Sequence, residues 1–451
     1  MRSRFRVNRR AGVIGWSWVA GLACLAALVH AAPNASAAAA SHPLLMTFWS
    51  DDFAHHAGNP LPGSVDASGA IVVNPTLTQQ LASVDVLAYA FLRVDEAGDV
   101  YFAHPDVDLS SADRVEFCKQ HASACPHAES ASGGSFSAFA HLDNQAHDLR
   151  RIVSIGGAGS QASMDNALSH IDEFVASATA LIRAYRLDGI DLDFEPDELF
   201  TVGQGESYVR LVNGLRHALG PLAFISIEVP GDWESIRSID CPAGAPCLRN
   251  LTAIAAAAYV SVMGYDFHHP EYPGGVTAND SSLYPDADEP LLPRFYHASD
   301  SQSVQYLTSR GVPAEKVLLG FPAYFVFYSA VHGTVANGGL YQPYDHTVTQ
   351  MFDLGYKDIG SDRIAAELLK SGFIRYAHMV GGELSAVYAF NAKSNQWISF
   401  EDPESVAAKA KFVRARNLGG MMMWEIGEDL PIHSGHSLLR SARRALSRVA
   451  H

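Results

Sequence analysis

Short runs of apolar residues alternate with longer stretches in which apolar residues recur at helical spacing along most of the chain. The short runs are typical of strands buried in a parallel sheet, and the helical stretches are typical of crossover connections. Eight such runs are Leu44–Ser50, Val86–Leu92, Arg151–Ile155, Gly189–Glu195, Ala223–Val229, Tyr259–Tyr265, Val317–Phe321 and Gly420–Trp424. Eight strands in β-then-α order predict an α/β fold, the (β/α)8 TIM barrel.

About a hundred residues separate the seventh predicted strand from the eighth, which is too many for a loop. Within this stretch Leu340–Tyr344 and Glu383–Phe390 look like strands, and Gly360–Ser371 looks like a helix. We therefore expect a small α+β insertion at residues 329–395. It interrupts a single barrel domain of residues 42–451, a length that such barrels routinely reach.

The N-terminus carries five arginines, then an uncharged run over residues 11–29 and small residues up to Ser41. This order is typical of a signal peptide at residues 1–37, with cleavage after Ala31 or Ala37. A retained transmembrane anchor is the alternative, because the apolar run approaches the length of a membrane span. We favour cleavage because signal peptidase accepts an alanine-rich exit, and we expect a secreted or periplasmic protein without stable membrane association.

Loss of this leader takes the formal charge from −16 to −21, because five arginines and no acidic residues leave with it. Phosphate binding requires a basic patch, so we expect no nucleic acid partner. A strongly acidic exported chain favours a neutral or cationic substrate. We expect a monomer.

Four cysteines remain after the leader, in two close pairs, Cys118 with Cys125 and Cys241 with Cys247. Export favours disulfides, and of the three possible connectivities the two local ones close short loops at low entropic cost. Neither spacing matches a structural zinc site, and adjacent histidines such as His268-His269 face opposite ways on a strand. We therefore expect no metal ion and no cofactor.

Four carboxylates fall within eight residues of the fourth predicted strand: Asp188, Asp191, Asp193 and Glu195. Strand side chains alternate between faces, so the last three share one face, while Asp188 is out of phase and is expected to be structural. If helices cover the apolar face, the acids look into a confined interior, where like charges keep a carboxyl protonated near neutrality. This predicts a general acid; an edge strand with its acidic face in water is the alternative.

The motif Asp188-x-x-Asp191-x-Asp193-x-Glu195 resembles the signature of family 18 glycoside hydrolases, the chitinases and their relatives. Three further motifs fall where that family has them: Ser154-Ile155-Gly156-Gly157, Met263-Gly264-Tyr265-Asp266 and Gly419-Gly420-Met421-Met422-Met423-Trp424. The resemblance covers Leu44 to Glu425. An α+β insertion after the seventh strand is similar to that of the family's bacterial chitinase branch.

The resemblance implies how a glycosidic bond would be cleaved. Glu195 would protonate the leaving oxygen, and the 2-acetamido oxygen of the substrate would attack the anomeric carbon. Asp193 would orient that acetamido group, Tyr265 would hold its carbonyl, and Asp191 would share a proton with Asp193. The implied substrate-binding residues are Trp424, Asp266, Met263 and Tyr324, and the implied supporting residues are Ser154, Gly156 and Gly157. Methionines commonly fill cores, so barrel packing competes with ligand contact for Met263.

Three positions depart from the family pattern. Phe48 stands where many relatives have a tyrosine that bonds the acidic cluster, so proton sharing at Asp191 is expected to differ. Ala158 stands where several chitinases have a tryptophan, and Phe325-Val326 replaces an arginine-bearing turn of some relatives. Contacts with individual sugar units are therefore less well predicted than the acidic strand.

The resemblance implies an exported, endo-acting chitinase that hydrolyses β-1,4-linked N-acetylglucosamine polymers, with chitin or chitooligosaccharides as its partners. An endo-β-N-acetylglucosaminidase acting on glycans or peptidoglycan would share the acidic strand, but the insertion favours a chitinase. A non-catalytic chitin-binding lectin is the third alternative. Such lectins typically replace the terminal glutamate of the motif, and Glu195 is intact.

Overall fold

The computed structural model describes residues 42–50, 63–65, 71–73, 75–110, 134–142, 148–268, 270, 275–290, 298–345, 351–355 and 372–447. The predicted signal peptide, the Cys118 and Cys125 pair and the predicted helix Gly360–Ser371 lie outside these residues. Within them, no helix combines the length and apolar character needed to cross a membrane.

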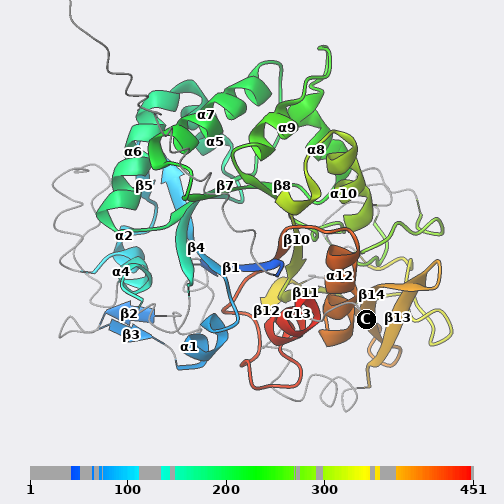
Figure 1. The fold of residues 1–451 in the computed structure, drawn as a ribbon. Helices are drawn as coiled ribbons and strands as arrows, with labels where there is room; N and C mark the ends of the chain where they lie inside the picture. The colour runs from blue at the N-terminus through cyan, green and yellow to red at the C-terminus, as the bar shows by residue number, and fades with distance from the viewer. Residues whose placement is uncertain are drawn as a thin grey trace, which may run out of the picture. The chain divides into compact units, whose positions relative to one another are not determined.

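Eight parallel strands close into a barrel, because β1 pairs with both β16 and β4 in the order β1-β16-β10-β9-β8-β7-β6-β4 (Figure 1). Their bounds are β1 Leu44–Ser50, β4 Val86–Val94, β6 Arg150–Gly157, β7 Gly189–Phe194, β8 Phe224–Val229, β9 Tyr259–Val262, β10 Val317–Pro322 and β16 Gly420–Trp424. Each corresponds to one of the eight predicted strands, so the predicted barrel is confirmed. The sixth strand stops at Val262 rather than Tyr265, because the chain turns out of the sheet there.

Helices surround the barrel where the sequence connects successive strands, as Figure 1 shows for α5 to α10. The apolar outer face of β7 packs against these helices. The ring centroid of Phe194 lies 6.4 Å from that of Phe174 and 5.9 Å from that of Tyr208. The helices are α1 Pro75–Leu81, α2 Pro105–Asp108, α4 Ser135–Ala140, α5 Gln161–Ser169, α6 Ile171–Ala184, α7 Gln204–Leu219, α8 Trp233–Asp240, α9 Asn250–Ala255, α10 Asp300–Ser309, the 3-10 helix Ala314–Lys316, α12 Pro403–Ala415 and α13 Leu438–Leu446.

An antiparallel sheet is inserted between β10 and β16, as the sequence predicts. Its strands are β11 Tyr324–Tyr328, β12 Met351–Gly355, β13 Ile374–Val380, β14 Glu383–Asn391 and β15 Gln396–Phe400, in the order β12-β11-β15-β14-β13. The sheet packs against α12 through β14 (Figure 1). The strand predicted at Leu340–Tyr344 is wrong: this segment forms only isolated bridges at Pro343 and Tyr344, and Pro343 has no N–H to donate.

Three short strands complete the described sheets. Strand β5 (Val100–Phe102) runs antiparallel to β4, and β2 (Gly63–Val65) pairs with β3 (Ile71–Val73). The predicted Cys241–Cys247 disulfide is confirmed, and it closes the turn that follows α8.

A buried ion network connects the inserted sheet to the barrel. Lys409 on α12 donates to Asp300 Oδ2 at 2.7 Å and to Ser281 Oγ at 2.6 Å, and its Nζ lies 3.1 Å from Glu401 Oε1. Asp300 begins α10, and Glu401 follows the last inserted strand. Ser281 in turn donates to the carbonyl of Gly264. The network therefore fixes the loop after β9 relative to the insertion.

Replacing Lys409 by Met should lower the free energy of unfolding by about 3–5 kcal/mol, because two buried carboxylates lose their shared cation. Urea unfolding at neutral pH measures this. The matched control is Lys411→Met on the same helix, whose partner Glu383 lies 3.3 Å away and whose side chain is 68% exposed. The control should cost less than about 1 kcal/mol. Equal losses for both variants would contradict the role given to the network.

Candidate active site

The acidic strand β7 directs its carboxylates into the barrel and its apolar side chains outward. Asp191 is 0% exposed and Asp193 is 4% exposed. Ile190 and Leu192 are buried in the outer core cluster, as the alternation in the sequence predicts. Glu195 follows the last residue of β7 and is partly exposed, so it lies where the carboxyl ends of the strands open to solvent.

Asp191 is held by a hydroxyl group on each side. Ser154 on β6 donates to its Oδ2 at 2.7 Å, and Ser226 on β8 donates to its Oδ1 at 2.6 Å. The three residues lie in one row, because β6, β7 and β8 pair in that register. Burial raises the pKa of Asp191 to about 6, and the two hydroxyl groups oppose this rise. Phe48 on β1 has no hydroxyl group to offer Asp191. The second hydrogen bond to Asp191 comes from Ser226 instead.

More neighbouring charges act on Asp193 than on Asp191 or Glu195. Burial raises its pKa well above the ordinary range, and the charges of Glu195, Glu228 and Asp191 add to this rise. Arg93 on β4 has the opposite effect. The Arg93 guanidinium donates to the carbonyl oxygens of Gly157 and Ala158. These two hydrogen bonds hold Arg93 over the turn after β6.

Glu195 combines a raised pKa with access to a cavity. Its backbone N–H donates to Ser160 Oγ at 2.8 Å, which fixes the start of the segment after β7. Burial raises the pKa of Glu195 to about 7, the charge of Asp266 contributes to the rise, and Arg93 opposes it. A carboxyl group with this pKa carries a proton in about half of the molecules at neutrality. It can therefore act as both an acid and a base.

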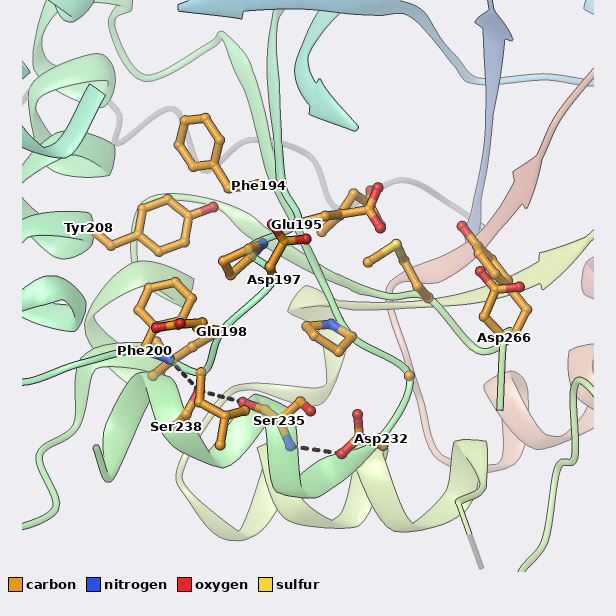
Figure 2. A pocket seen from close by; sticks show the side chains of 18 of the residues that line it. Phe194, Glu195, Asp197, Glu198, Phe200, Tyr208, Asp232, Ser235, Ser238 and Asp266 are labelled. Carbon is orange, nitrogen blue, oxygen red and sulfur yellow. Dashed lines mark hydrogen bonds between the residues drawn. The ribbon is translucent and has the colours of Figure 1, made fainter. Parts of the chain in front are cut away.

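The cavity beside Glu195 has a volume of about 300 Å³. In Figure 2, Glu195 lies between Tyr208 on one side and Asp266 on the other. Its lining is strongly acidic and includes Glu195, Asp197, Glu198, Glu228, Asp232 and Asp266. This composition fits a neutral or cationic ligand better than an anionic one.

The segment after β9 brings an aromatic and an acidic residue to the same opening. Tyr265 is buried and packs edge-on against Tyr324, with ring centroids 6.0 Å apart. The hydroxyl of Tyr324 donates to Asp266, and Asp266 adopts a left-handed φ of 60°. Burial raises the pKa of Tyr265, so its hydroxyl keeps its proton and can donate it to a ligand carbonyl. Met263 lines the cavity beside Tyr265.

Trp424 ends β16, on the side of the barrel opposite β7. Its ring stacks on the ring of Phe91, with a centroid distance of 5.4 Å and an interplanar angle of 11°. The ring centroid of Phe48 lies 5.2 Å from that of Trp424. Trp424 is half-buried and is not among the residues that line the cavity beside Glu195. The three methionines before it are completely buried, as expected for barrel packing.

Two glycines allow β6 to approach its neighbours closely. A Cβ on Gly156 would lie 1.9 Å from the carbonyl oxygen of Asp193, and one on Gly157 would lie 2.6 Å from the ring of Phe91. Both residues also have positive φ, at 132° and 85°. Asp188, by contrast, is exposed before the start of β7, where its Oδ2 accepts the Arg151 N–H at 2.8 Å. It therefore lies outside the cavity.

The sequence alone did not single out Ser226, Glu228 or Arg93 as site residues. Ser226 and Glu228 alternate with apolar residues in β8 as the acids do in β7. This weaker alternation could have indicated that both side chains face the barrel interior. For metals, the described residues include no group of three or more His, Cys, Asp or Glu side chains arranged to hold an ion. His268, one of the adjacent histidines, instead pairs with the buried carboxylate of Glu289 at 2.5 Å.

A closed barrel with buried acids at its carboxyl end and one partly exposed glutamate beside a cavity is the architecture of a barrel glycosidase. The family model of glycosyl hydrolases family 18 matches residues 46–429, so the chain belongs to that family. The predicted family resemblance is confirmed.

Several relatives are chitinases. Chitinase A1 of Niallia circulans is 28% identical over 305 residues, which cover 62% of this chain and 41% of that enzyme. Chitinase ChiA74 from Bacillus thuringiensis has a similar fold, with a TM-score of 0.68, 19% identity, and coverage of 90% of this chain and 70% of that one. A family 18 N-acetylglucosaminidase from Paenibacillus barengoltzii gives a TM-score of 0.60 at 20% identity, covering 90% and 100% of the two chains.

Asp266→Asn should lower the pKa of Glu195 from about 7. After burial, the charge of Asp266 is the largest cause of the raised pKa. The expected decrease is about one unit. Carbon-13 NMR titration of glutamate-labelled protein measures it, with Glu195→Gln used to assign the signal. A Glu195 that titrates near 4.5 in the unmodified protein would contradict this electrostatic description of the site.

Proposed function

We propose that this chitinase-like glycoside hydrolase is an exported chitinase that cleaves β-1,4-linked N-acetylglucosamine polymers. The observation that carries the proposal is Glu195, a carboxyl group at the edge of a cavity with its pKa raised to about 7. Glycosidic cleavage requires a proton on the leaving oxygen, and a group with this pKa supplies one at neutral pH. The chitinase relatives support the choice of polymer.

In the proposed reaction, Glu195 protonates the leaving oxygen while the acetamido oxygen of the substrate attacks the anomeric carbon with retention. Asp193 accepts a hydrogen bond from the acetamido N–H, and its otherwise unpaired Oδ1 is free for this contact. Tyr265 donates to the acetamido carbonyl, and Met263 borders the same part of the cavity. Glu195 then takes a proton from the water that opens the oxazolinium ion.

The remaining assignments belong to the same proposal. Trp424 provides an aromatic floor for a sugar ring, Asp266 and Tyr324 form a polar edge, and the chain acts as a secreted or periplasmic monomer. An endo-β-N-acetylglucosaminidase is the competing function. Incubation with chitin oligomers, glycoprotein glycans and peptidoglycan, followed by mass spectrometry of the products, separates the two: cleavage confined to chitin oligomers supports a chitinase, and cleavage confined to glycans or peptidoglycan refutes it.

Glu195→Gln should lower kcat on chitin oligomers by roughly 10²–10⁴-fold, because general acid catalysis contributes that much. The amide has nearly the same shape as the acid, so folding and oligosaccharide binding should persist. Initial rates and isothermal titration with the same oligomer measure the two effects. Turnover close to that of the unmodified protein would show that another group donates the proton.

If the acetamido group is the nucleophile, cleavage requires an N-acetyl group on the sugar that precedes the scissile bond. Fully deacetylated chitosan should then be inert, and partly acetylated chitosan should yield new reducing ends that are N-acetylated. Mass spectrometry of the product ends tests this. Reducing ends that are mostly glucosamine, or a sugar bound covalently to Asp193 in enzyme quenched during turnover, would indicate an enzyme nucleophile instead.

A further inference from the structure

Glu228 is a fourth carboxyl group inside the barrel, and the proposed reaction does not use it. It lies on β8 two residues after Ser226, so its side chain points to the same interior face. The side chain lines the cavity together with Glu195 and Tyr265, although the residue is only 3% exposed. Its hydrogen-bonding neighbours are the Ser261 hydroxyl and the Asp191 carboxyl group.

The strand register places Glu228 next to the acidic motif. Strands β7 and β8 pair Asp191 with Ser226, and continuing this register by two residues brings Asp193 opposite Glu228. On its other side, β8 pairs Glu228 with Ser261 of β9. Glu228 therefore lies in the same row of interior positions as Asp193, one strand away.

Burial determines the protonation of Glu228. An ionised carboxylate beside other carboxyl groups is expensive in a buried site, so the group keeps its proton. Burial raises its pKa well above the usual 4.5, the charge of Asp191 adds to the rise, and the Ser261 hydroxyl opposes it. The other titratable or charged groups around the acids are Asp193, Glu195, Tyr265 and Asp266, with Tyr208 from α7 and Arg93 from β4.

We propose that Glu228 is a positioning residue that holds a proton beside Asp191 and Asp193 and thereby keeps Glu195 protonated to higher pH. The proposal rests on the proposed function. Both oxygens of Asp191 accept hydrogen bonds from serine hydroxyls, so Asp191 is held ready for a negative charge. A proton that moves from Asp191 to Glu228 breaks one O–H bond and forms another, and the negative charge moves to Asp191. The cluster then keeps its total number of protons.

Glu228→Gln tests this role, because the amide fills the same volume but cannot ionise. Glu228→Gln removes one carboxyl group from the cluster, so the cluster carries one negative charge fewer when it shares the same number of protons, and Glu195 then loses its proton at lower pH. The basic limb of the kcat/KM profile on a chitin oligomer should therefore move to lower pH by about one unit. Glu228→Ala should move the limb in the same direction. The matched control Glu206→Gln, at an exposed position on α7, should leave the limb in place.

A Glu228→Gln enzyme with the wild-type basic limb would overturn the proposal. A Glu228→Gln chain that fails to fold would overturn it too, because a neutral amide is a close replacement for a protonated carboxyl group. An unmodified chain that cleaves no chitin oligomer would refute the proposed function, and the Glu228 proposal would then be decided by stability.

The stability measurement does not require activity. Glu228 is protonated when folded and ionises above its usual pKa of 4.5 when unfolded, so its burial destabilises the fold increasingly as the pH rises above that value. Glu228→Gln should therefore raise Tm, relative to the unmodified chain, more at about pH 8 than at about pH 4. An equal change in Tm at both pH values would show that Glu228 holds no proton.

Discussion

The burial of several carboxyl groups in one closed barrel is the constraint on which the rest of the site depends. Burial and mutual repulsion both disfavour the ionised form, so the acids of β7 and β8 cannot all be charged near neutrality. The raised pKa values of Asp191, Asp193, Glu195 and Glu228 follow from this constraint. Of the four, Glu195 is the group at the carboxyl end of the barrel that is partly exposed. The barrel thus stores protons inside and presents one at its opening.

The surrounding structure holds these carboxyl groups in place through hydrogen bonds, close strand packing and a buried ion network. Serine hydroxyls fix Asp191, and the absence of side chains at Gly156 and Gly157 lets β6 approach β7 and the ring of Phe91. The buried Lys409 network extends the support to the inserted sheet and to the loop that carries Tyr265. Removing a member of this network should therefore disturb the position of the cavity as well as stability.

Much of the barrel was predictable, because its strands are short, largely apolar or alternating runs separated by helical stretches, and the bounds of β1 and β16 match the predicted runs. The inserted strand β13 escaped prediction because its face is largely exposed and its sequence shows no clear alternation. The acids of β7 were predictable because they lie close together in one motif. Glu228 was not, since a single acid in an apolar strand becomes part of the site only through the register of β8 with β7, which is a long-range property.

The central claim is that Glu195 delivers a proton while the acetamido group of the substrate attacks, so that the configuration at the anomeric carbon is retained. Proton NMR of a chitin oligomer during the first minutes of hydrolysis tests this claim directly, because it distinguishes the two anomers before they equilibrate. Retention predicts that the β-anomer appears first at the new reducing end. Initial formation of the α-anomer, or no hydrolysis at all, would contradict the claim.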